Sequence, residues 1–167
     1  MNANAKQPPQ ITVLGIGNIL LTDEGFGVRV VEKLFTDYTF PDHVAIVDGG
    51  VLGISLLGYM AAADHLIVVD AVKNRQPPGT FYRLESHELP CRILMKNSLH
   101  QTDFLETLTL CQALDKVPET VVLGVEPEDI QTYGVDLTPT LQACVDEMVG
   151  RVLKELSRLG VQGQSKG

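Results

Sequence analysis

Four short runs of Val, Ile and Leu most strongly constrain how this chain can fold. They are ITVLGI (11–16), HVAIVD (43–48), HLIVVD (65–70) and TVVLGV (120–125). None of them alternates cleanly between apolar and polar residues, which is typical of strands that are covered on both faces of a sheet. A fifth run, TFYRLE (80–85), alternates better and follows the turn signal PPG, so we expect it at an edge of the sheet.

Helical patterns separate these runs. Apolar residues recur at helical spacing near 25–37, 52–62, 101–115 and 138–159. Strands that alternate with helices are typical of a mainly parallel sheet with helices on both faces. We therefore predict a single α/β domain with a twisted sheet of about five strands.

The length of 167 residues fits one domain, which we place at residues 11–160. The polar residues 1–10 and 161–167 are expected to be flexible tails.

The first run continues into a glycine-rich stretch, LGIGNILLTDEGFG. Such a turn suggests phosphate binding, but the dinucleotide fingerprint requires a third glycine where this chain has Leu20. The P-loop pattern fails as well, because no Gly-Lys-Ser/Thr follows. Asp23 and Glu24 near the start of the helix would also compete with a phosphate for the helix dipole. We therefore expect Gly15 and Gly17 to serve a sharp turn rather than phosphate binding.

Asp23 is expected to cap the helix that follows it. Glu24 is a candidate ligand, and two further residues, Asp70 and His100, occupy positions that suit the same site. Asp70 ends the run HLIVVD, at the edge of the sheet where ligands bind in such folds. His100 ends a long irregular stretch before a predicted helix. Two carboxylates and one imidazole would form an open ligand set for nickel, manganese or zinc. Each of the three residues could also be a cap, turn or surface residue. Their spacing along the chain alone does not show that they converge on one site.

Charge and composition narrow the possible partners. The formal net charge of −8 disfavours nucleic acid and anionic membranes as main partners. The N-terminus, MNANAKQPPQ, has no apolar segment of a secretory signal, and no run is long enough to span a bilayer. Cys91, Cys111 and Cys144 are scattered and odd in number, which fits a reducing compartment. We expect a cytoplasmic protein.

Six stretches carry a resemblance to a known family. They are GIGNILLTDEGFGVRV, VDGGVLG, ADHLIVVDAV, PPGT, SLHQ and LGVEPE, in this order along the chain. With them the chain resembles the maturation endopeptidases of nickel–iron hydrogenases, from about Ile11 to the last predicted helix. The resemblance implies a twisted α/β sheet sandwiched by helices, in agreement with the pattern of strands and helices.

The resemblance also implies a site and an activity. In that family a Glu or Asp, an Asp and a His bind the metal, and TDEG, VVDA and SLHQ carry these roles over to Glu24, Asp70 and His100. The family's enzyme recognises nickel in the precursor of the hydrogenase large subunit and cleaves off a C-terminal extension. Nickel would then belong to the substrate, and the three residues would be both metal-binding and catalytic. Metal-assisted hydrolysis and a carboxylate general base both remain open.

Other residues are candidates for holding the extended peptide, and other functions stay open. Asp48, Gly49 and Gly50 follow the second run, and Lys73 and Arg75 follow the third. For the two basic residues, a solvated loop is the simpler interpretation.

Two alternative functions stay open for the chain: a non-catalytic nickel-binding maturation chaperone and a nucleotide-binding α/β enzyme. We expect a monomer that acts on a transient partner.

Overall fold

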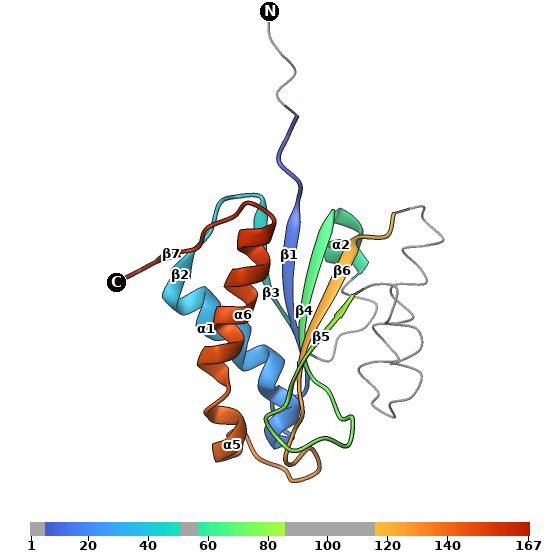
Figure 1. Ribbon diagram of the computed structural model, residues 1–167, viewed down its shortest axis with the longest axis vertical. Coiled ribbons are helices and arrows are strands. Elements are labelled where there is room, and N and C mark those ends of the chain that lie inside the picture. Colours follow the sequence, from blue (N-terminus) through green and yellow to red (C-terminus); the bar gives the residue numbers. More distant parts are fainter. Residues whose placement is uncertain (1–5, 51–56, 86–115) are drawn as a thin grey trace, which may run out of the picture.

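The computed structural model describes residues 6–50, 57–85 and 116–167. Within these ranges five strands form one sheet in the order β3-β1-β4-β6-β5 (Figure 1). The neighbours β3, β1, β4 and β6 pair in parallel, whereas β5 pairs antiparallel with β6. The strand bounds are β1 (Ile11–Ile16), β3 (Val44–Gly50), β4 (His65–Ala71), β5 (Phe81–Glu85) and β6 (Glu119–Val125). The predicted five-strand sheet, with the 80–85 run at an edge, is confirmed.

Helices cover both faces of the sheet. The helices α1 (Phe26–Asp37) and α6 (Val145–Arg158) lie on one face, and α2 (Leu57–Ala62) packs on the other (Figure 1). The expected helix at 138–159 is interrupted, because a short helix α5 (Pro139–Gln142) precedes α6. The expected helix at 101–115 and the first part of that at 52–62 lie outside the described residues. Among the described helices, none combines the length and the apolar character that a membrane crossing requires.

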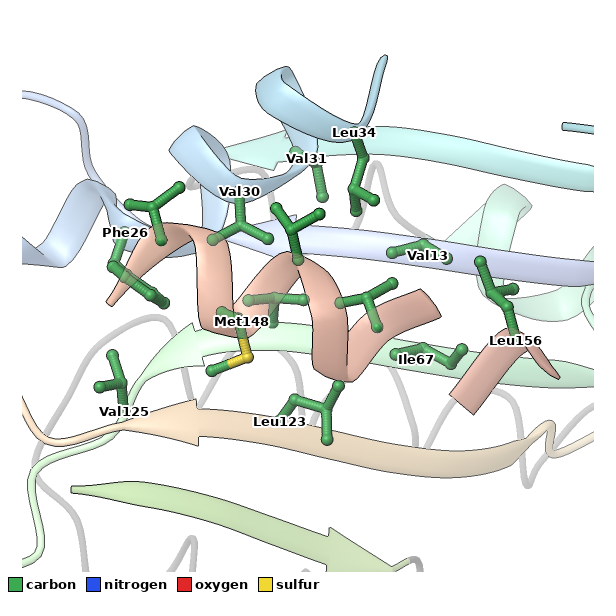
Figure 2. Packing of buried hydrophobic residues seen from close by; sticks show 14 of the residues in the cluster. Val13, Phe26, Val30, Val31, Leu34, Ile67, Leu123, Val125, Met148 and Leu156 are labelled. Carbon is green, nitrogen blue, oxygen red and sulfur yellow. The ribbon is translucent and has the colours of Figure 1, made fainter. Parts of the chain in front are cut away.

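The larger core lies between the sheet and the helices α1 and α6. Phe26, Val30 and Leu34 recur at helical spacing along α1 and point toward the sheet (Figure 2). Met148 of α6 lies in the same cluster as Ile67 of β4. The opposite face of the sheet packs against α2 in a second, smaller cluster. Because both faces are covered, the central strands carry continuous apolar runs rather than alternating ones.

The end of the chain departs from the expectation of a free tail over residues 161–167. Val161 is buried in the larger core. The strand β7 (Gln164–Ser165) pairs antiparallel with β2 (Tyr38–Thr39), directly after α1. Two-residue strands leave no periodic pattern in a sequence, so the hydrophobic pattern could not predict this pairing.

Candidate functional site

The carboxyl ends of the parallel strands gather several loops at one end of the molecule. The turn after β1, the loop 72–80 and the segment 126–138 all lie at this end, at the bottom of Figure 1. Each loop follows directly from the carboxyl end of a strand: β1, β4 or β6. This is the edge at which α/β sheets of this type bind ligands.

Glycines make the turn after β1 possible. Gly17 has a φ of +140°, and a Cβ there would lie 1.7 Å from the Glu24 carbonyl oxygen. A Cβ on Gly27 would lie 2.2 Å from the carbonyl oxygen of Val69, so the start of α1 sits directly against β4. Any larger residue would push the backbone apart at these two positions. The predicted role in a sharp turn is therefore confirmed for Gly17. Gly15 lies within β1 instead, where a Cβ would lie 2.3 Å from the Gly27 carbonyl oxygen, so it allows α1 to pack closely on the strand.

This turn carries one predicted ligand toward another. Glu24 lies half-buried in the 3-10 turn η1 (Thr22–Gly25), and η1 contacts β4. Asp70 is the last residue but one of β4, next to Gly124 in register, and is only 5% exposed. The structure thus brings the turn with Glu24 against β4, the strand that carries Asp70. His100, the third predicted ligand, lies outside the described residues.

The metal site remains a prediction. Within residues 6–50, 57–85 and 116–167, no three His, Cys, Asp or Glu residues are grouped so that they could hold a metal ion. The predicted set draws only Glu24 and Asp70 from this part of the chain. Carboxylate oxygens with one imidazole suit a divalent transition ion, so the donor chemistry fits the predicted metal.

Asp23 does not cap the helix, and the capping prediction is wrong. Neither η1 nor α1 has a side-chain hydrogen bond at its N-cap. The fully buried Asp23 carboxylate instead accepts hydrogen bonds from the backbone N–H groups of Glu128 (2.9 Å), Asp129 (2.9 Å) and Thr138 (2.8 Å). The Thr138 hydroxyl also donates to it at 3.0 Å. Asp23 therefore ties the segment 126–138 to the turn that carries Glu24.

Glu126 holds a second loop at this edge, a role that the sequence analysis did not assign. It is buried just after β6, and its carboxylate accepts hydrogen bonds from the backbone N–H of Asn74 (2.8 and 3.0 Å) and from the Tyr82 hydroxyl. These bonds fix the loop that follows Asp70. Its position directly after an apolar strand was the available signal.

The predicted peptide-binding residues lie at the same edge. Asp48 is exposed and lies opposite Gly15 in register, and its Oδ1 accepts a hydrogen bond from the Gly50 N–H at 2.9 Å. The Gly50 carbonyl in turn accepts a hydrogen bond from the Gly17 N–H at 2.9 Å. Gly49 is buried between them. The residues 48–50 thus border the turn after β1, while their binding role stays a prediction.

The basic candidates and a neighbouring acid add charge to this edge. Lys73 and Arg75 are exposed on the loop after β4. On the segment 126–138, hydrogen bonds from the Thr132 side chain and from the backbone of Thr132 and Gln131 lower the pKa of Asp129. Asp129 therefore stays ionised at neutral pH and contributes negative charge beside the turn with Glu24.

Comparisons with known proteins agree with this architecture. A family model described as hydrogenase maturation protease matches residues 28–155. Hydrogenase 2 maturation protease of Escherichia coli (strain K12) is 43% identical over 155 residues, which cover 92% of this chain and 94% of that protein. Hydrogenase expression/formation protein HupD of Thiocapsa roseopersicina is 42% identical over 159 residues, or 93% of this chain and 72% of that one. The solved structure of hydrogenase maturating endopeptidase HybD from E. coli superposes with a TM-score of 0.90 at 41% identity, over 94% of this chain and 98% of that chain.

Proposed function

Because this chain belongs to the hydrogenase maturation protease family, we propose that it removes the C-terminal extension from the precursor of a nickel–iron hydrogenase large subunit. The chain is a peptidase, as its family and the endopeptidase structure that it matches show. Membership of this family favours neither the non-catalytic chaperone nor the nucleotide-binding enzyme.

The proposed site for nickel consists of Glu24, Asp70 and His100, and the nickel is carried by the substrate. One observation supports it most: the glycine turn brings η1, with Glu24, into contact with β4, the strand that carries Asp70 near its carboxyl end. Carboxylate and imidazole groups are suitable ligands for Ni²⁺. Where a phosphate-binding loop would recognise negative charge, this turn is suited to recognising a cation.

The surrounding charge supports a cation in the same place. The stretches 11–28 and 120–138 contain no Lys or Arg, whereas they contain six Asp or Glu residues: Asp23, Glu24, Glu126, Glu128, Asp129 and Asp136. These acids outnumber the basic residues near this edge, which are Arg29, Lys73 and Arg75. A surface rich in acidic groups raises the local concentration of cations. A precursor that carries Ni²⁺ would therefore bind more favourably here than the same precursor without the metal.

Two routes of hydrolysis suit these residues. A divalent ion at this site supplies Lewis acidity, which polarises a scissile carbonyl or lowers the pKa of a water. Alternatively, a carboxylate accepts the proton of the attacking water as general base. Glu24 is half-buried and Asp70 nearly fully buried, so Glu24 is the more accessible of the two to water.

The substrate peptide is proposed to lie along the neighbouring strand ends. Asp48, Gly49 and Gly50 border the glycine turn, and Lys73 and Arg75 are exposed on the next loop. We also propose a monomer in the cytoplasm without nucleic-acid or membrane partners. The compartment rests on the scattered cysteines and the excluded partners on the net charge of −8, whereas the monomer is the simplest state for an enzyme that acts on a transient partner.

Incubation with the purified large-subunit precursor tests this function. We expect the nickel-loaded precursor to lose one C-terminal fragment, measured by mass spectrometry, and the nickel-free precursor to stay intact, because only the loaded form presents a cation to the acidic site. Equal cleavage of both forms would contradict nickel recognition. Failure to cleave either form would contradict the proposed substrate.

A further inference from the structure

Four exposed apolar side chains lie on the two segments that Asp23 joins beside Glu24. They are Ile19 (38% exposed), Leu20 (55%), Tyr133 (86%) and Val135 (55%), which we call the rim patch. The other exposed large apolar side chains of the described residues lie elsewhere, namely Phe35, Tyr59 and Val117. Exposed apolar side chains that gather on one surface are typical of an interaction site.

Backbone hydrogen bonds hold the two halves of the rim patch together. Leu21 and Gly134 form a parallel bridge, and the Gly134 N–H donates to the Leu20 carbonyl at 3.0 Å. The Thr22 N–H donates to the Gly134 carbonyl at 2.9 Å, and the Thr22 hydroxyl donates to the Thr132 carbonyl at 2.6 Å. With Asp23 fixed to both segments, the patch is formed before any partner binds. Such a preformed surface binds with a smaller loss of conformational entropy.

The charge around the rim patch is mainly negative. Glu128 and Asp136 are exposed on the segment that carries Tyr133 and Val135. The stretches 17–25 and 126–138 contain no Lys or Arg. One cation reaches the patch from α1: the Arg29 guanidinium donates to the Val135 carbonyl at 2.9 Å, and Glu32 pairs with it at 3.0 Å. A partner that complements this surface carries apolar side chains together with basic ones.

We propose that the rim patch docks the precursor through a polypeptide segment with apolar and basic side chains close to the scissile bond. This inference rests on the proposed function, because the patch adjoins the turn that carries Glu24. The mixed apolar and acidic surface selects the substrate protein, while the metal-binding residues recognise its nickel. Tyr133 is the expected anchor, since exposed tyrosines are common among the residues that dominate binding energy.

Steady-state cleavage of the nickel-loaded precursor tests the docking surface. For the double variant Leu20→Ser/Tyr133→Ser, we expect KM to rise about tenfold with kcat within about twofold of wild type, because substrate binding is lost and the reacting groups are unchanged. The single variant Tyr133→Ser should raise KM in the same direction, and its side chain is too exposed to affect folding. Phe35→Ser is the matched control, since Phe35 is 70% exposed near the far end of α1, and it should leave both constants unchanged.

The acidic residues are tested by salt dependence. In Glu128→Gln/Asp136→Asn, kcat/KM should fall less steeply with added NaCl than in wild type, because fewer charges steer the substrate. An unchanged KM in Tyr133→Ser and in the double variant, with wild type active, would overturn the docking proposal alone. An inactive wild type would overturn the proposed function, and the docking proposal with it.

Discussion

Glu24→Gln should abolish processing of the nickel-loaded precursor while the protein stays folded. Glutamine keeps the size of the side chain and its half-buried position in η1 but loses the charge that a cation requires. We expect kcat/KM to fall by about 10³-fold or more, the size of effect found when one member of a concerted catalytic set is removed. Asp70→Asn should have an effect of the same order. The measurement is the rate of C-terminal cleavage, with circular dichroism to verify folding.

A matched control separates this effect from a general change in charge. Glu32 lies on α1, where it pairs with Arg29 at 3.0 Å on the surface. Glu32→Gln should therefore cleave the precursor at the wild-type rate. Wild-type processing by a folded Glu24→Gln protein would show that Glu24 has no part in the reaction.

Gly17→Ala should destabilise the protein strongly and abolish activity with it. The new Cβ would lie 1.7 Å from the Glu24 carbonyl oxygen, and the φ of +140° is strained for any L side chain. Overpacking and backbone strain each cost about 1–3 kcal/mol, so we expect a loss of about 4 kcal/mol in the free energy of unfolding. Urea denaturation measures this loss.

Gly150→Ala is the control for the glycine substitution. Gly150 lies within α6, and a Cβ there would have nothing within 4 Å. Alanine in a helix interior should raise the free energy of unfolding by about 0.5–1 kcal/mol. If Gly17→Ala unfolded at the wild-type urea concentration, the steric account of the turn would be wrong.

The sheet could be predicted from the sequence because its strands are buried on both faces. Short continuous apolar runs such as HLIVVD indicate buried strands, and the helices between them require parallel pairing. The short pairing of β7 with β2 could not be predicted, since each strand has two residues. The break between α5 and α6 was also missed, because the apolar spacing continues across it.

The role of a site residue could be predicted where it follows from position in the fold, and could not where it depends on contacts with residues far along the chain. Asp70 could be predicted because it lies near the carboxyl end of a strand, at the ligand-binding edge. Asp23 was misread as a cap, because the N–H of Glu128, one of the groups that its carboxylate binds, lies 105 positions later in the chain. The exposure of Leu20 could not be predicted either. An apolar residue that follows a buried strand looks in the sequence like part of the core.

Paramagnetic Ni²⁺ is the most direct probe of the proposed metal site. Titrated into the isotope-labelled protein, it should broaden the NMR amide resonances of Glu24 and Asp70 together at the same concentrations, and Glu24→Gln should remove the effect. His65 and Glu119 form an alternative pair at the opposite end of the strands, 3.3 Å apart. Broadening confined to that pair, with Glu24 and Asp70 unaffected, would contradict the proposed site.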